Sequence, residues 1–308
     1  MHACITPRPD RTFLNRHALS TSFPQNGKRP RRGFDPRYCG FHLETRTPAH
    51  QGDAASLSTI KKWRARVKST VNKPLEYVHD DARLLGYFSQ PEGDKLPGIL
   101  LVHDAFGVSD FIKGIAEKLA GEGYATLAAD IWGDGKVLSS ESEIGPMIGR
   151  FAADRKTWMG RLQAAREALA AQPGVDGERI VMLGYCFGGA SALEYLRTVG
   201  DVRGAVSIHG GLDLVSEEWA HSPSPRKALL LTGYEDPMAA LPKLAALQHN
   251  MNGAGVDWEV NLYGHTRHGF TRPDSDRANK PHVIAYHAQS DKRAWAALKR
   301  FLEESLAS

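Results

Sequence analysis

A single cysteine stands where the sequence changes from a strand pattern to a helix pattern. Residues 179–196 read RIVMLGYCFGGASALEYL, an apolar run that passes Cys186 and continues with apolar residues at helical spacing. A strand that turns sharply into a helix holds its turning residue in strained backbone geometry, with the side chain clear of the sheet. The helix N-terminus behind that residue favours a thiolate. The pattern therefore predicts a nucleophilic thiol at Cys186.

The residues around the cysteine are small where such a turn needs space. We expect Gly184 and Gly188 to leave room for the tight turn and Gly189 to let the helix pack closely. The backbone N–H of Phe187 would then face the position of a tetrahedral oxyanion. A free cysteine is also among the most buried residue types, so a purely structural Cys186 is the alternative interpretation. Other residues of the chain must decide between the catalytic and the structural interpretation of Cys186.

An acid is expected after the nucleophile and before the histidine, because strand-to-helix nucleophile turns place their partners in that chain order. The apolar run KALLLTG ends in GYEDP, so Asp236 lies just beyond the C-terminal end of a predicted strand. Asp236 also fits a helix N-cap before Pro237. The two roles are compatible, and Glu235 is the nearest rival acid.

Two histidines follow the next predicted strand, in LYGHTRHGFTRP. His265 and His268 both lie where this chain order requires a base. A histidine in a loop is often merely solvated. An ordered succession of cysteine, acid and histidine at strand ends is nevertheless much less frequent by chance than any one of them, so the set predicts nucleophilic catalysis.

One more carboxylate follows the first buried strand, in LLVHDAFG. The loop after this strand is expected to supply the second oxyanion donor, the N–H of Ala105. Asp104 is placed to contact Cys186 and hold its proton until substrate arrives, and a carboxylate that caps its own loop is the alternative interpretation.

Short apolar runs alternate with amphipathic stretches from about residue 73 onward. Strands are expected in residues 74–91 (two, joined at Asp80–Asp81), within 96–107, and in 124–130, 179–185, 202–210, 227–233 and 257–264. Helices are expected in residues 110–123, 141–171 and 291–306. This alternation predicts an α/β fold, a doubly wound and mostly parallel sheet flanked by helices in a single domain. Ligand sites of such sheets gather at the carboxyl ends of the strands.

The basic charge of the chain belongs to its N-terminal part. Residues 1–60 hold nine Lys or Arg and four Asp or Glu (9 − 4 = +5), whereas the other 248 residues hold 30 and 31 (30 − 31 = −1). Residues 1–65 are predicted to be a disordered or loosely attached basic extension, and residues 66–308 the folded domain. The arginine-rich run in this extension also fits a nuclear, anionic-surface or transit signal. A neutral body argues against nucleic-acid binding.

Composition also bears on the compartment. No stretch approaches the apolar length that crosses a bilayer, and the N-terminus lacks the apolar segment of a secretory signal. Three scattered cysteines, Cys4, Cys39 and Cys186, form neither a disulfide framework nor a CxxC zinc pattern. We expect a cytoplasmic protein without a bound metal.

Four motifs in order give the chain a resemblance to the dienelactone hydrolase family of α/β-hydrolases, over about residues 72–306. They are HDAFG, GYCFGG, GYED and HGF. The resemblance implies hydrolysis of a lactone or ester through a thioester acyl-enzyme, with no metal or cofactor. It selects Cys186 as nucleophile, Asp236 as acid, and His268 rather than His265 as base.

The same resemblance assigns substrate contacts. Family members grip a substrate carboxylate with arginines, and Arg272 matches one of them, while Arg150 and Arg155 are unaligned candidates for the second. Trp132 replaces the family's tyrosine and changes one wall of the pocket. Asp104 stands where the family has a thiol-shielding glutamate that is one methylene longer.

Two other functions compete with a cysteine hydrolase. A catalytically lapsed relative that serves as a binding or interaction module is the main alternative, although the complete set of cysteine, acid and histidine argues against it. A serine esterase or peptidase would need a GxSxG turn, which the chain lacks. We expect a monomer that acts on a small-molecule ester or lactone, without nucleic-acid or membrane partners.

Overall fold

The structure is a computed structural model that describes residues 69–222, 226–275 and 280–307. All of these belong to one unit of the chain, Asp53–Ser308. The N-terminal extension predicted for residues 1–65 lies outside the described residues.

The first two strands form the predicted hairpin. Strand β1 (Thr70–His79) pairs antiparallel with β2 (Ala82–Pro91) along its whole length. Asp80 adopts a left-handed conformation at the turn, with φ 49°, which aspartate tolerates better than most residues. The turn lies at Asp80–Asp81, as the sequence predicts.

The remaining strands build a parallel sheet beside this hairpin. They are β3 (Leu96–Val102), β4 (Ala125–Ala129), β5 (Val175–Tyr185), β6 (Gly204–Ile208), β7 (Lys227–Gly233) and β8 (Asp257–Tyr263). The order across the eight-stranded sheet is β1-β2-β4-β3-β5-β6-β7-β8, with β2 antiparallel to β4 and the strands from β4 to β8 parallel. This architecture confirms the predicted α/β-hydrolase fold.

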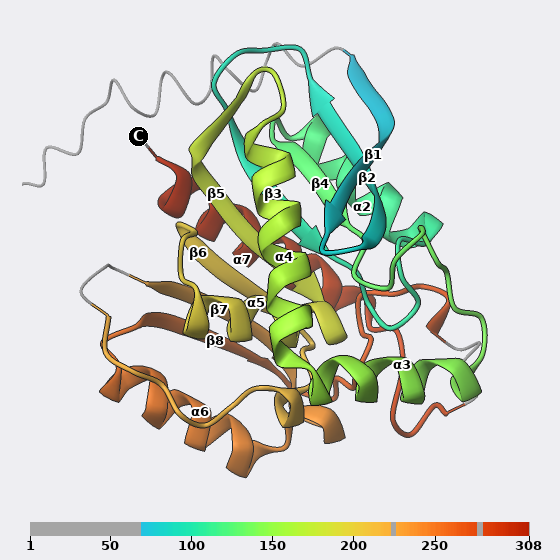
Figure 1. Cartoon of the computed structure of the whole chain (residues 1–308). Coiled ribbons are helices and arrows are strands. Elements are labelled where there is room, and N and C mark those ends of the chain that lie inside the picture. Colours follow the sequence, from blue (N-terminus) through green and yellow to red (C-terminus); the bar gives the residue numbers. More distant parts are fainter. Residues whose placement is uncertain (1–68, 223–225, 276–279, 308) are drawn as a thin grey trace, which may run out of the picture. The chain divides into compact units, whose positions relative to one another are not determined.

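Helices cover both faces of the sheet (Figure 1). Those whose residues join the core on one face are α2 (Asp110–Gly121) and α7 (Ala288–Leu306). Those on the other face are α3 (Glu141–Ala153), α4 (Arg155–Ala170), α5 (Phe187–Thr198) and α6 (Leu241–Gly253). The stretch expected to be helical from Glu141 to Ala171 is thus two helices. They separate at Asp154, whose carboxylate caps α4 by accepting the Thr157 N–H at 3.0 Å.

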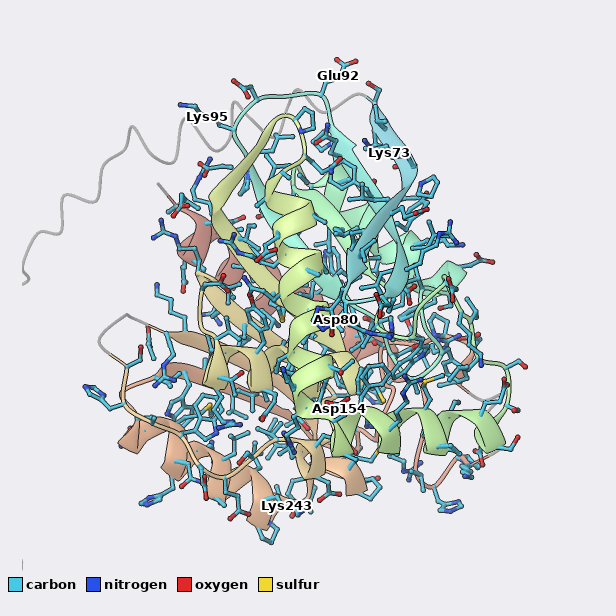
Figure 2. All side chains as sticks on the ribbon, in the orientation of Figure 1. Lys73, Asp80, Glu92, Lys95, Asp154 and Lys243 are labelled. Atoms are coloured by element: carbon cyan, nitrogen blue, oxygen red, sulfur yellow. The ribbon has the colours of Figure 1, made fainter. Side chains whose placement is uncertain are left out.

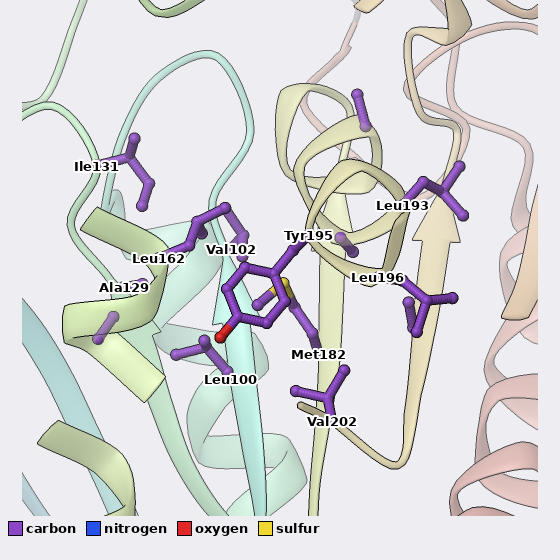
Figure 3. Packing of buried hydrophobic residues seen from close by; sticks show 14 of the residues in the cluster. Leu100, Val102, Ala129, Ile131, Leu162, Met182, Leu193, Tyr195, Leu196 and Val202 are labelled. Carbon is purple, nitrogen blue, oxygen red and sulfur yellow. The ribbon is translucent and has the colours of Figure 1, made fainter. Parts of the chain in front are cut away.

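Alternating side chains of the buried strands supply both cores. In β3, Ile99 and Leu101 belong to the core beneath α2 and α7, and Leu100 and Val102 to the opposite core. Figure 3 shows Leu100 and Val102 among side chains of α4 and α5. Each fully buried side chain of this kind contributes about 1.5–3 kcal/mol. Continuous apolar runs therefore identify strands that are covered on both faces.

Charged side chains mark the outside of the same layers. The six that Figure 2 labels, among them Lys73, Asp154 and Lys243, are all exposed. Within the residues that the structure describes, no helix is both long and apolar enough to cross a bilayer. The candidate site residues lie in the loops that follow β3, β5, β7 and β8, at the carboxyl ends of these parallel strands.

Candidate active site

Cys186 is the turning residue between β5 and α5. Its backbone has φ 53° and ψ −113°, a conformation that costs on the order of 1–3 kcal/mol for a residue other than glycine. The Cys186 N–H donates to the Ile208 carbonyl at 3.0 Å, and its own carbonyl accepts the Gly189 N–H at 3.0 Å. These bonds to β6 and α5 fix the strained turn. The thiol is free and half-buried.

The glycines of this turn are required by backbone contacts. A Cβ on Gly184 would lie 2.0 Å from the Gly188 carbonyl oxygen, and one on Gly188 would lie 2.2 Å from the Val102 carbonyl oxygen. A Cβ on Gly189 would come within 2.8 Å of Ser207 Oγ on β6. The predicted need for small residues at these positions is confirmed, and the Gly188 contact brings the loop after β3 against the cysteine turn.

Asp236 and His268 form a buried pair from the loops after β7 and β8. His268 Nδ1 lies 2.9 Å from Asp236 Oδ2, and the two side chains are 4% and 0% exposed. The other carboxylate oxygen of Asp236 accepts the Met238 N–H at 2.8 Å, so Asp236 also caps the short helix η2 (Pro237–Ala239). Asp236 therefore both caps η2 and contacts the imidazole of His268. The carboxylate fixes the proton of the ring on Nδ1 and leaves Nε2 available.

The charge state of His268 follows from its neighbours. Burial opposes protonation, but the charges of Cys186 and Asp236 outweigh it and raise the pKa of His268 to about 10. Nε2 is buried and makes no hydrogen bond to another described residue. Cys186 is nevertheless near enough to raise the pKa of the ring. These neighbours therefore favour the protonated imidazole of His268 at neutral pH.

The rival acid and the rival histidine also lie next to each other, but at the surface. His265 Nδ1 lies 3.4 Å from Glu235 Oε1, with side chains 93% and 35% exposed. Glu235 contacts Arg267 at 3.1 Å as well. The same two loops therefore hold one buried and one exposed pair of acid and histidine.

The backbone of His268 is held by a segment that returns past it. The His268 N–H donates to the Val283 carbonyl at 3.1 Å, and the His268 carbonyl accepts the Ala285 N–H at 3.2 Å. The His287 N–H donates to the Phe270 carbonyl at 3.0 Å. This pairing, which includes a β-bridge between His268 and Ile284, was not expected from the sequence.

A buried histidine fixes the loop that carries Ala105. His103 Nδ1 lies 2.6 Å from the Asp104 carbonyl oxygen, and its Nε2 lies 3.2 Å from the Ile131 nitrogen. Because a carbonyl only accepts and an amide N–H donates, the proton must lie on Nδ1. Burial lowers the pKa of His103, which keeps the ring neutral. Phe187 begins helix α5, where the first N–H groups have no partner within the helix.

Asp104 is bonded on both of its oxygens. Oδ1 accepts the Phe106 N–H at 2.9 Å, and Oδ2 accepts from Arg272 Nη1 at 2.6 Å. It therefore caps its own loop, as one interpretation of the sequence held, and it contacts the arginine that follows His268. The guanidinium of Arg272 also lies over the rings of Phe106 and Phe111, at 4.7 and 5.0 Å.

Trp132 packs behind the nucleophile turn. Its ring centroid lies 4.7 Å from those of His103 and Phe187 and 5.4 Å from that of Phe151. Arg155, one candidate for a second substrate arginine, is bound to buried Glu194 at 2.6 Å and so supports helices α4 and α5.

His209 is a site residue that sequence reasoning missed. It follows β6, has φ 38°, and its ring lies 5.0 Å from that of His268. Nε2 lies 2.9 Å from Thr271 Oγ1, while Nδ1 has no hydrogen-bond partner among the described residues. Burial, together with the charge of His268, lowers the pKa of His209 well below its ordinary value. Its place after a strand, at the same edge of the sheet as the nucleophile, was the available signal.

Across residues 69–222, 226–275 and 280–307, no group of three His, Cys, Asp or Glu side chains is arranged to hold a metal ion. The site consists of a strained thiol at the start of α5, a buried acid–histidine pair, and the loop that follows β3. Such a set can carry out acyl transfer.

Comparisons with known proteins agree with this geometry. The sequence model of the dienelactone hydrolase family matches residues 84–306. A protein of Yersinia pestis that carries the name carboxymethylenebutenolidase is 24% identical over 226 residues, which cover 69% of this chain and 80% of that protein.

Solved structures show the same likeness. A structure titled m3DLH is 30% identical, with a TM-score of 0.71, and covers 78% of this chain and 100% of its own. The structure of P91, described as a dienelactone hydrolase-like promiscuous phosphotriesterase from metagenomic libraries, gives the same identity, TM-score and coverage. A Klebsiella pneumoniae structure with a TM-score of 0.62 and 20% identity, covering 76% of this chain and 99% of its own, shares the fold.

Proposed function

The chain belongs to the dienelactone hydrolase family and is an ester or lactone hydrolase, and we propose that it works through a triad of Cys186, His268 and Asp236. Its substrate is a small ester or lactone, and a thioester acyl-enzyme is the intermediate. The buried Asp236–His268 pair beside the strained thiol carries this proposal.

The first half-reaction forms the thioester. The Cys186 thiolate attacks the carbonyl carbon, and the N–H groups of Phe187 and Ala105 stabilise the oxyanion. The bond from carbon to the leaving oxygen breaks, and His268 gives its Nε2 proton to that oxygen. Asp236 keeps the other ring proton on Nδ1 and stabilises the charged ring.

The second half-reaction releases the acid. Neutral His268 takes a proton from water as that water attacks the thioester carbon. The carbon–sulfur bond breaks, the acid leaves, and the thiolate beside protonated His268 is restored. The raised pKa of His268, about 10, supports this resting state. Asp104, Arg272 and Trp132 are proposed to shape the substrate side of the site.

Replacing the sulfur tests the proposal directly. Cys186→Ala should abolish hydrolysis of 4-nitrophenyl acetate by the purified full chain, and intact-mass analysis should find an acetyl adduct on the native protein but not on the variant. Undiminished turnover by Cys186→Ala would reject the triad.

A labelling experiment provides the matched control. Iodoacetamide at neutral pH should modify Cys186 rapidly, because a thiolate reacts and a thiol does not. Cys4 and Cys39 remain in Cys186→Ala and report the background rate. If Cys186 were labelled no faster than this background rate, the result would favour a binding module over an enzyme.

We further propose that the protein acts as a cytoplasmic monomer without a nucleic-acid partner. The neutral charge balance of residues 61–308 and the three scattered cysteines support this. Sedimentation at micromolar concentration checks the oligomeric state.

A further inference from the structure

A cavity of about 430 Å³ lies beside the loop that follows β3. Arg272 forms part of its wall and also binds Asp104, the residue immediately before Ala105. The cavity is therefore joined through one side chain to the loop of the proposed oxyanion donor. Its lining residues are Val108, Ser109, Asp110, Phe111, Lys113, Val137, Arg272 and Asp274.

All three nitrogens of the Arg272 guanidinium already donate to carboxylates. Nε and Nη2 lie 2.7 and 3.3 Å from the two oxygens of Asp274, and Nη1 lies 2.6 Å from Asp104. Recognition of a carboxylate by arginine uses two parallel N–H groups on one edge of the guanidinium. Asp274 occupies one such edge fully, and Asp104 takes half of the other.

Among the contacts of Arg272 the charge balance is negative, because one guanidinium meets the carboxylates of both Asp104 and Asp274 (1 − 2 = −1). The three side chains are 18%, 7% and 35% exposed, so water screens them only partly. Lys113, the other cation of the lining, lies 3.5 Å from Asp110. No cationic side chain in the lining is left without a nearby carboxylate.

The rest of the lining suits an uncharged group. Val108 is buried, Val137 is 51% exposed, and the ring of Phe111 lies against the guanidinium. An alkyl or neutral ester group would cover such surfaces, whereas a second carboxylate would enter a negative site and lose its hydration.

We infer that Asp274 makes this enzyme selective for uncharged esters, because it keeps Arg272 from gripping a substrate carboxylate. The inference rests on the proposed function and names the substrate class of that site. It differs from the carboxylate grip that the family resemblance implies for Arg272. Asp274 acts through Arg272 and is a specificity-determining residue.

The experiment uses two substrates that differ only in charge, 4-nitrophenyl hydrogen adipate and its methyl ester. The native enzyme should have the higher kcat/KM for the methyl ester. Asp274→Asn releases one edge of Arg272 and should raise the anionic-to-neutral ratio of kcat/KM about tenfold, which corresponds to about 1.4 kcal/mol. Asp274→Glu keeps the charge and should retain the native ratio.

A matched control separates the local effect from net charge. Glu141→Gln removes a charge from an exposed ion pair with Lys280 and should leave the ratio unchanged. A native enzyme that prefers the anionic ester, or a ratio that Asp274→Asn does not move, would overturn the inference. Asp274→Ala provides a second variant should the asparagine fold poorly.

A binding measurement keeps this test independent of catalysis. Titration should show that the native protein binds hexanamide more tightly than hexanoate, and that Asp274→Asn narrows this difference. If neither ester were hydrolysed, the proposed function would fail, and the titration alone would decide the inference. If the native protein and Asp274→Asn preferred hexanamide over hexanoate to the same degree, the result would contradict the inference.

Discussion

Two pairs of acid and histidine lie in the loops after β7 and β8, and only one of them is buried. Asp236 and His268 are almost wholly buried and 2.9 Å apart, whereas Glu235 and His265 are exposed and 3.4 Å apart. In both pairs a carboxylate after β7 meets a histidine after β8, so the chain order is the same. What differs is water, since a charge pair at contact gains about 1 kcal/mol in bulk water and several times more at a partly shielded site.

The comparison teaches that burial, and not the presence of an acid and a histidine, distinguishes the pair proposed for catalysis from its neighbour. The buried carboxylate fixes one ring proton and holds the charge of the ring close to the thiol. The exposed pair can rotate and exchange its partners with water. The following experiments test this difference between the buried and the exposed pair.

The largest contrast is expected between the two histidines. His268→Gln should lower kcat for 4-nitrophenyl acetate by about 10⁴-fold or more, because the proton donor and acceptor is lost. His265→Gln, at a side chain that is 93% exposed, should stay within about twofold of native. Steady-state kinetics measures both, and a comparable loss in His265→Gln would remove the distinction between the pairs.

The two acids should differ in the same sense. Asp236→Asn should lower kcat about 10³-fold, since the amide no longer stabilises the charged ring or secures its tautomer. The matched change Glu235→Gln should have little effect on kcat. Circular dichroism verifies that the η2 cap survives in Asp236→Asn, and native kcat in that variant would exclude Asp236 as the acid.

The buried pair should also leave a signature in stability. The folded pKa of His268, about 10, lies above its unfolded value near 6.5, so the charged ring stabilises the fold fully below pH 6.5. That contribution, on the order of a few kcal/mol, should be lost as pH rises towards 10. Denaturant unfolding of native protein and His268→Gln measures it, and curves that stay parallel from pH 6 to 10 would refute the shift.

A smaller effect is expected at the ring packed against the pair. His209→Phe keeps a ring next to His268 but loses the bond to Thr271, and kcat should fall about tenfold with little change in KM. His209→Gln retains an acceptor for Thr271 and should recover part of the loss. Native kcat in His209→Phe together with a loss in His209→Gln would assign the effect to packing of the ring alone.

The smallest effect concerns the nucleophile turn. Cys186→Gly removes side-chain strain at φ 53° and should raise the unfolding free energy by about 1 kcal/mol relative to Cys186→Ala, while both variants are inactive. Urea unfolding of the two variants provides the measurement, and a less stable glycine variant would show that the turn is unstrained.

Much of the fold could be predicted because its determinants are local. The apolar runs of β3 to β8 and the turn at Asp80–Asp81 are readable from neighbouring residues. Spacing alone did not distinguish Asp236 and His268 from Glu235 and His265, because the burial of a side chain depends on the whole fold. Only the family resemblance selected the first pair. The long helical stretch is interrupted at Asp154, whose carboxylate caps helix α4. Helix propensities alone do not reveal this interruption.

The remaining site residues could not be predicted for a different reason. The ring of His209, which follows β6, contacts His268 in the loop after β8, and the bond from Arg272 to Asp104 joins segments 168 residues apart. Contacts across such distances depend on the register of the sheet, which no single motif encodes.

The three backbone bonds from the segment around residue 284 give the C-terminus an unexpected part in activity. A chain that stopped at Ser275 would contain every strand and every proposed triad residue, yet the histidine would lose the segment that anchors its main chain. Truncation at that point would remove this anchor and helix α7 together, so the shortened chain would lose both the position of its histidine and the cover of one sheet face. Engineering of the C-terminus therefore has to preserve the stretch from Lys280 onward.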